Sequence, residues 1–246
     1  DPFLMAGVGL AAWIVLGVVL SGLGVPLDWR LILGLAVAGP VIGEIRRIRR
    51  GGTRPSLRFF RFGWHNGAVL AIFLINLWIY TRGAFAYPWL EDDDSWGHAA
   101  GMKYVALMKT LRAPAGVFPY INPYPPGYDG VMGLLHQTSP SLVWTLKFFN
   151  SLIVALSLVY CYRLVRDYSG DRRRALWALA VLSALPCYLS HFIWAHSLVI
   201  LLFFVALIAV KTSWQDRSFF APAATAVSAI FLTQPTQSIK FVILLA

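Results

Sequence analysis

Apolar residues in this chain form long unbroken runs instead of alternating with polar ones. The runs cover 3–24, 28–45, 65–82, 141–163, 174–190, 193–211 and 218–233, and another begins at 239. About 20 apolar residues in a helix cross the ~30 Å hydrocarbon core of a bilayer. Lipid offers no partners to backbone groups, and barrel strands would show alternation, so continuous runs indicate helices. The pattern predicts an all-α polytopic membrane protein.

Composition supports the same class. Hydrophobic residues make up 58% of the chain and charged residues 13%, whereas soluble domains carry about 25% charged residues. The net charge of +10 could elsewhere indicate a nucleic-acid partner. Here the basic residues lie mainly between apolar runs, as in cytoplasmic loops of membrane proteins. We therefore expect the lipid bilayer as a partner, and no nucleic acid.

The basic residues also predict the topology. Segment 44–61 (EIRRIRRGGTRPSLRFFR) is the most basic interval, which places it and the N-terminus in the cytoplasm. Counting runs from there puts 83–140 outside and 163–174 and 211–217 inside. Both of the latter are also rich in basic residues, so the assignment is consistent along the chain.

Two parts are expected from this order. Residues 1–62 would form two N-terminal transmembrane helices and a basic cytoplasmic loop, and residues 63–246 a transmembrane core whose long outer loop is 83–140. The last apolar run breaks off at residue 246, so we expect the sequence to be the N-terminal part of a longer protein.

The outer loop divides into three segments. Residues 94–112 predict an amphipathic helix along the membrane surface; its apolar stripe would comprise Trp96, Ala100, Leu107 and Leu111. Residues 113–130 are rich in Pro, Gly and Tyr and predict extended or turning chain, and 131–139 is a short apolar segment. Loops of this length are often functional.

Four consecutive carboxylates, Glu91 to Asp94, open this loop. One or two acids before a helix are explained by capping and by the helix dipole. Four would repel one another, and a cation beside them would relieve the repulsion. His98 lies one turn after Asp94 on the same helix face, and carboxylates with an imidazole suit Mg²⁺ or Mn²⁺. A solvated cap and a functional carboxylate cluster both remain open interpretations.

Two further segments carry candidate chemistry. PYPPGYD, Pro123 to Asp129, is either a stiff proline turn or a surface whose tyrosines stack on a sugar. FLTQPTQSIK lies on the same predicted side as the acidic loop; its Gln234 and Lys240 either form a polar turn or face a lipid phosphate. His191 and His196 in SHFIWAHS are expected at the membrane interface beside Trp194, and contact with a lipid phosphate is the alternative.

The order of these features resembles the GT-C superfamily of membrane glycosyltransferases over roughly residues 65–235. Asp94-Ser95-Trp96-Gly97-His98 is similar to the oligosaccharyltransferase pattern of Asp, any residue, aromatic, any residue, Asn or His. Tyr124-Pro125-Pro126-Gly127 resembles turns of the arabinosyl- and mannosyltransferase branches. The chain differs in having two apolar runs before the first helix typical of the superfamily, and in ending before any C-terminal domain.

The resemblance implies a GT-C-like helix bundle that transfers a sugar from a polyprenyl-phosphate or polyprenyl-diphosphate donor to an extracytoplasmic glycan, lipid or protein acceptor. Asp94 would be the catalytic base or a metal ligand, assisted by Asp93. A divalent cation would be held by Asp92, Asp94 and His98. Substrate contacts would come from Trp96, Tyr124, Tyr128, Asp129, Gln234 and Lys240.

Two alternatives belong to other classes. The chain could be a transporter or flippase for lipid or polysaccharide, or a non-catalytic membrane subunit. The apolar runs carry almost no ionisable residue, which argues against ion-coupled transport because transporters usually place such residues within their spans.

Overall fold

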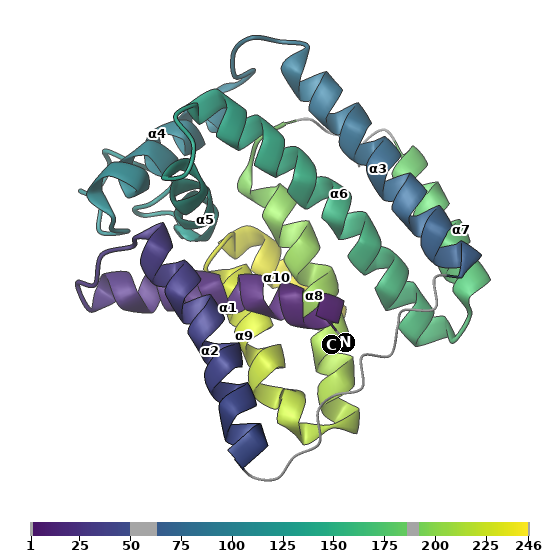
Figure 1. Ribbon diagram of the computed structural model, residues 1–246. Helices are drawn as coiled ribbons and strands as arrows, with labels where there is room; N and C mark the ends of the chain where they lie inside the picture. Colours follow the sequence, from purple (N-terminus) through teal and green to yellow (C-terminus); the bar gives the residue numbers. More distant parts are fainter. Residues whose placement is uncertain (1, 50–62, 186–191, 246) are drawn as a thin grey trace.

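The computed structural model describes residues 2–49, 63–185 and 192–245, and within these ranges every regular element is a helix (Figure 1). The elements are α1 (Pro2–Gly22), α2 (Trp29–Arg49), α3 (Trp64–Phe85), α4 (Asp93–Met108), α5 (Gly127–His136), α6 (Leu142–Ser169), α7 (Arg172–Ala184), α8 (Ala195–Gln215), η1 (Arg217–Phe219), α9 (Phe220–Phe231) and α10 (Pro235–Leu245). The all-α prediction is confirmed. Residues 50–61 of the predicted basic loop, and His191, lie outside the described ranges.

Four of these helices are long and apolar enough to cross a membrane: Phe3–Gly22, Trp64–Phe85, Leu142–Ser169 and Ala195–Gln215. The other predicted spans differ from the observed helices. The helix at 28–45 is α2, which gathers Arg46, Arg47 and Arg49 in its last turn. The predicted spans at 174–190 and 218–233 overlap α7, of 13 residues, and α9, of 12 residues. Both helices are shorter than the roughly 20 residues that cross a bilayer.

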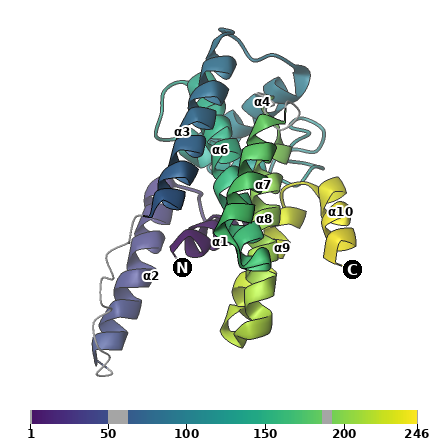
Figure 2. The ribbon, with the colours of Figure 1, turned by 90° about the vertical axis from the view of Figure 1, so that its right-hand side faces the viewer.

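The bundle is organised around α6 and α8. Helix α6 contacts α3, α7 and α8, while α8 continues the series through α9 to α10. Figure 2 shows this order, with α3 at one edge and α10 at the other. The core of α8 is fully buried and uses residues spaced for one wide helical face; they are Leu198, Leu201, Leu202, Val205, Ala206 and Ala209.

Helix α1 crosses this bundle instead of running along its edge (Figure 1). It contacts α9, α8 and α5, and Leu4, Val8, Ala11 and Ile14 belong to the main core cluster. A Cβ placed on Gly7 would lie 2.5 Å from Val205 Cγ2, so the glycine permits the close crossing. Helix α1 therefore shares one core with α8 and α9.

The turn between α1 and α2 is bound to the loop that follows α4. Leu27 N donates to Lys109 O at 2.7 Å, and Lys109 Nζ pairs with Asp28 Oδ2 at 2.5 Å. Gln137 adds two bonds, from its Nε2 to Leu27 O at 2.7 Å and from Trp29 N to its Oε1 at 2.9 Å. We call this set of contacts the turn clamp. It joins segments about a hundred residues apart in sequence.

The segments predicted to share one side of the membrane do lie together. Ser95 Oγ donates to Ile193 O at 3.2 Å, and Gly127 N donates to Leu232 O at 2.8 Å. The loop of residues 83–140, the start of α8 and the α9–α10 turn thus meet at one end of the bundle. The basic segments meet one another elsewhere, since Lys211 Nζ donates to the carbonyl of Asp167.

Helix α4 differs from its prediction in bounds and in buried face. It covers Asp93–Met108 instead of 94–112 and ends where Lys109 adopts a left-handed conformation, with φ of 54°. Its buried residues are Ser95, His98, Ala99, Gly101, Met102 and Val105. The predicted apolar stripe faces outward, with Trp96 47% and Leu107 70% exposed. Small residues occupy the protein-facing side of α4 because α4 packs closely on α5: a Cβ on Gly133 would lie 2.6 Å from Val105 Cβ.

Candidate functional site

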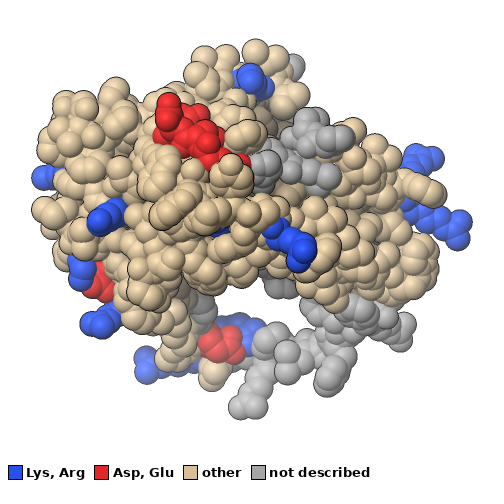
Figure 3. Space-filling model, turned by 90° about the horizontal axis from the view of Figure 1, so that it is seen from above, with Lys and Arg blue, Asp and Glu red and all other residues tan. Residues whose placement is uncertain are grey.

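The acidic run begins the site, and its first structural role is helix capping. Asp92 adopts an extended conformation, and its Oδ1 accepts a hydrogen bond from Ser95 N at 2.8 Å, as an N-cap residue does. The sequence predicted a helix that begins at residue 94, whereas the observed helix begins at Asp93 and its cap is Asp92. Glu91, Asp93 and Asp94 are exposed, and Figure 3 shows acidic side chains gathered in one compact patch on the face seen from above.

Glu91 acts on a buried lysine, Lys147, that the sequence analysis did not single out. Lys147, in α6, is only 2% exposed; its Nζ donates to Tyr87 O and lies 5.7 Å from the Phe85 ring centroid. Glu91 acts on it electrostatically. The four groups bind the start of the acidic loop to α6. Lysine inside a predicted span was the available signal, because ionisable groups there have specific partners.

Asp94 is exposed and held by a tyrosine. Its Oδ1 accepts a hydrogen bond from Tyr120 Oη, which lies in the irregular segment between α4 and α5. Partial burial, and secondly the negative acceptor, raise the pKa of Tyr120 above its ordinary value, so the phenol stays protonated and remains a donor. Tyr120 was not among the predicted site residues, since the spacing of residues in a loop does not show which side chain returns to the helix.

Beneath Asp94 lies a buried pair, His98 and Asp129. His98 Nδ1 and Asp129 Oδ1 are 2.6 Å apart, and their side chains are 4% and 0% exposed. The carboxylate fits because position 101 is glycine: a Cβ there would lie 2.9 Å from Asp129 Cγ and closer still to Oδ2. Burial raises the pKa of Asp129 to about 6, against an opposing effect of His98. Asp129 was predicted to contact substrate, but the structure buries it against α4.

Two aromatic rings pack against His98, and one of them connects it to the core. Its ring centroid lies 4.2 Å from that of Tyr120 and 4.7 Å from that of Tyr128. Tyr128 was also predicted to contact substrate, but it is 1% exposed and its Oη donates to Asn150 Oδ1 of α6 at 3.1 Å. Burial of its phenol raises the pKa of Tyr128 well above the ordinary value. Tyr128 therefore fixes α5 to α6 and is covered at this surface.

Tyr124 and Gln234 come together as neighbours of this site. Tyr124 Oη donates to Gln234 Oε1 at 2.7 Å, and the Tyr124 ring meets the edge of Tyr120 at 5.6 Å between centroids. Thr236 Oγ1 also bonds to the Gln234 oxygen, at 3.1 Å. The sequence predicted that the loop carrying Tyr124 and the turn carrying Gln234 lie on the same side, but it did not predict that these two side chains bond to each other. Tyr124 is half-buried and Gln234 is buried.

Positive and titratable groups face the same place from α8 and α10. Lys240, Asp94 and His98 each act electrostatically on His196, so His196 lies within range of all three. Lys240 is exposed, whereas Nδ1 of His196 is buried and has no hydrogen-bond partner among the described residues. The sequence predicted His196 at the membrane interface, with a lipid-phosphate contact as the alternative, but its proximity to Asp94 could not be read from sequence.

The predicted metal ligands have separate partners. Asp92 caps α4, Asp94 accepts from Tyr120 and His98 bonds to Asp129. Over the described ranges, the structure gathers no group of three or more His, Cys, Asp or Glu side chains that could hold a metal ion. Asp92, Asp94 and His98 therefore do not form the predicted three-ligand set in this part of the chain.

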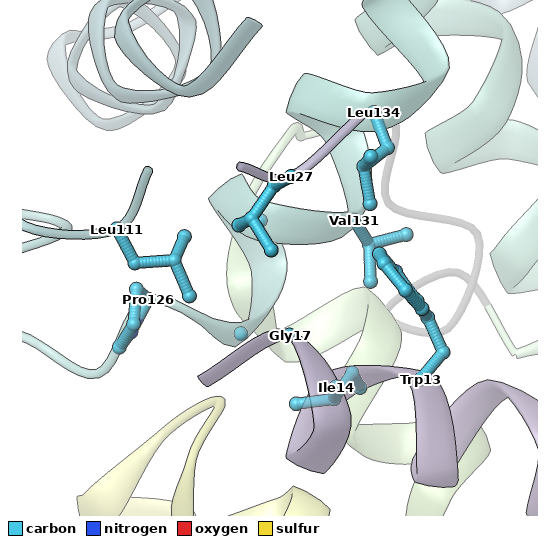
Figure 4. Close-up of a pocket in the computed structure, with 10 residues that line it drawn as sticks. Trp13, Ile14, Gly17, Leu27, Leu111, Pro126, Val131 and Leu134 are labelled. Carbon is cyan, nitrogen blue, oxygen red and sulfur yellow. The ribbon is translucent and has the colours of Figure 1, made fainter. Parts of the chain in front are cut away.

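A small apolar pocket lies on the other side of α5. Figure 4 shows residues from α1, the turn clamp and α5 around it. Its lining is Trp13, Ile14, Gly17, Leu27, Leu111, Pro126, Gly127, Gly130, Val131 and Leu134. Since none of these side chains is polar, the pocket offers no chemistry to the site.

The site therefore combines an exposed carboxylate, a buried imidazole–carboxylate pair, tyrosine hydroxyls and a lysine at one end of an apolar helix bundle. Such a set can accept a proton from a hydroxyl and can attract an anion. Comparison of the chain with protein-family models, with curated proteins and with solved structures found no match.

Proposed function

We propose that this chain is the core of a membrane glycosyltransferase of GT-C type, which takes a sugar from a polyprenyl-phosphate or polyprenyl-diphosphate donor. The observation that supports it best is the exposed Asp94 carboxylate, held by Tyr120, near His196 and Lys240. Four candidate spanning helices make a lipid-linked substrate accessible to this bundle. The proposed base, Asp94, and the basic side chain of His196 thus lie within electrostatic range at one end of an apolar bundle.

The proposed sugar transfer needs only a few groups from the protein: one base, and positive charge near the leaving phosphate. The oxygen of an acceptor hydroxyl forms a bond to the anomeric carbon, while the bond from that carbon to the phosphate oxygen breaks and leaves its electron pair on the phosphate. The acceptor proton passes to Asp94. One positioned base of this kind contributes about 10²–10⁴-fold, and Lys240 with His196 would face the charge that develops on the leaving phosphate.

A divalent cation would neutralise the phosphate if the enzyme uses one. Asp94, the proposed base, and its neighbour Asp93 are exposed carboxylates in the first turn of α4, and oxygen ligands of this kind suit Mg²⁺ or Mn²⁺. Trp96, exposed on the outward face of α4, provides an apolar surface for the sugar or the lipid chain. These roles are parts of the proposal.

The proposal is tested with the full chain in lipid nanodiscs and radiolabelled polyprenyl-phosphate mannose and arabinofuranose as probes, with membrane extract as the acceptor source. Release of polyprenyl phosphate and label transfer are measured. Asp94→Asn should lose at least about 100-fold. Glu44→Gln, which changes an exposed acid on α2 outside the site, is the matched control and should lose less than about tenfold. Treatment with EDTA, followed by Mg²⁺ or Mn²⁺, tests the cation. Transfer that survives Asp94→Asn unchanged would refute the role of Asp94.

A further inference from the structure

Tyr120 holds Asp94 from a segment that is itself fixed. Its neighbour Ile121 is 4% exposed and packs in the cluster that contains Val105 and Leu134. On the other side, Tyr124 N donates to Pro119 O at 3.1 Å. The segment cannot swing freely, because burial of Ile121 anchors one flank of Tyr120 and a backbone bond closes the other.

A second fixation comes from the α9–α10 turn. Tyr124 Oη donates to Gln234 Oε1 at 2.7 Å, and the Tyr124 ring abuts that of Tyr120. Asn122 Nδ2 also donates to Ala113 O at 3.0 Å, across the base of the segment. Tyr120 is thus supported from three directions, and its hydroxyl is delivered to Asp94 by a prearranged loop.

Gly97 provides the space in which the Tyr120 ring lies. A Cβ at position 97 would lie 2.6 Å from Tyr120 Cδ2, and closer still to Cε2. Real Cβ atoms do not approach other atoms so closely, so any residue other than glycine would displace the ring. Glycine inside a helix costs roughly 0.5–1 kcal/mol relative to alanine. The close approach of Tyr120 gives a reason for this glycine at that position.

We propose that Tyr120 is the positioning residue for Asp94: its hydroxyl occupies one carboxylate oxygen and fixes the plane of the group, so that the other oxygen takes the acceptor proton. Gly97 is the seat that makes this contact possible. The inference rests on the proposed function, in which Asp94 is the base. A carboxylate held in one orientation needs no reorganisation when the proton is transferred.

Tyr120→Phe removes only the hydroxyl. Loss of one hydrogen bond to a charged group predicts a fall in kcat of roughly 10- to 100-fold, with the KM for polyprenyl-phosphate mannose or arabinofuranose unchanged. Gly97→Ala should give the same kcat phenotype although alanine favours the helix. Tyr104→Phe is the matched control. Tyr104 lies on α4, the helix of Asp94, and donates to Arg112 O at 2.6 Å, so it also ties α4 to the following loop, through a bond that does not involve Asp94. It should keep wild-type kcat.

A double-mutant cycle separates positioning from general loosening. Asp94→Glu keeps a carboxylate but moves it by one methylene, out of register with Tyr120. In that background Tyr120→Phe should change kcat by less than about twofold, since the contact is already lost. An equal loss in both backgrounds, wild-type kcat in Tyr120→Phe, or an equal loss in Tyr104→Phe would overturn the inference. An active Asp94→Asn variant would instead refute the proposed function, so the two failures are distinguishable.

Discussion

Replacing Asp129 with asparagine should stabilise the protein at neutral pH. Asp129 is buried, and Oδ2 of its carboxylate has no hydrogen-bond partner in the described part of the chain. Burial raises its pKa from the ordinary 3.8 to about 6 even with His98 beside it. A difference of this size corresponds to about 3 kcal/mol, a large part of the net stability of a typical domain.

The sign follows from proton binding in the two states. Below pH 3.8 the folded and unfolded chains both hold the Asp129 proton, and burial of the neutral acid costs nothing extra. As the pH rises the unfolded chain releases this proton first, so stability falls until the folded group has also ionised above about pH 6. Asparagine cannot ionise, and its variant avoids this loss.

The assay compares thermal unfolding of Asp129→Asn and wild type in the same detergent at pH 4.5 and pH 7.5, followed by tryptophan fluorescence. The difference should widen by about 2 kcal/mol in favour of the variant, or about 4–8 °C for a chain of this size. Asp93→Asn, an exposed acid on α4, is the control and should show no such trend. A variant that becomes relatively less stable as the pH rises would refute the reasoning.

Two further predictions concern packing. Gly7→Ala should lower stability by about 1–3 kcal/mol by overpacking, because its Cβ would lie 2.5 Å from Val205 Cγ2. Gly17→Ala, in the same helix with nothing within 4 Å of its Cβ, should raise stability by about 0.5–1 kcal/mol. Equal shifts in melting temperature would contradict the crossing of α1 over α8. Gln137→Ala should lose about 1–3 kcal/mol by leaving Leu27 O and Trp29 N without their bonds. Gln215→Ala, at an exposed helix end, is its control in the same melts.

Helix class was predictable here because it depends on composition over long windows. Unbroken apolar runs allow little besides helices in lipid, and the four candidate spans fall within or around predicted runs. The ends of α4 were not predictable in the same way. Asp92, Asp93, Asp94 and Ser95 can each cap a helix. In the structure Asp92 is the cap, and the hydroxyl of Ser95 bonds instead to Ile193 O, a partner 98 residues away in sequence.

The candidate site was predicted only where its residues are close in sequence. Asp94 was singled out from the acidic run, and its exposure agrees with a functional carboxylate. The partners of the site come from other segments: Asp129 is 31 residues from His98, and Gln234 is 110 residues from Tyr124. Helical spacing relates residues a turn apart, but it carries no information about contacts set by packing of distant elements.

Tyr128 and Asp129 were misassigned for a related reason. A Pro-rich segment predicts a turn, and turns are usually exposed, so both side chains were expected at the surface. Gly127 instead begins helix α5, which packs into the core through Gly130, Val131 and Met132. The glycines permit this burial, because a Cβ on Gly127 would lie 2.6 Å from Leu232 O.

The turn clamp has a consequence for the order of synthesis. Asp28 leaves the ribosome 81 residues before Lys109 and Leu27 leaves it 110 residues before Gln137. At 5–20 residues per second the turn waits about 4–16 s for Lys109. During that interval Leu27 N and Asp28 Oδ2 lack these two partners, although Asp28 Oδ1 can already accept from Arg30 N. The turn between α1 and α2 therefore forms the contacts of the turn clamp only after the loop that carries the candidate site has been synthesised.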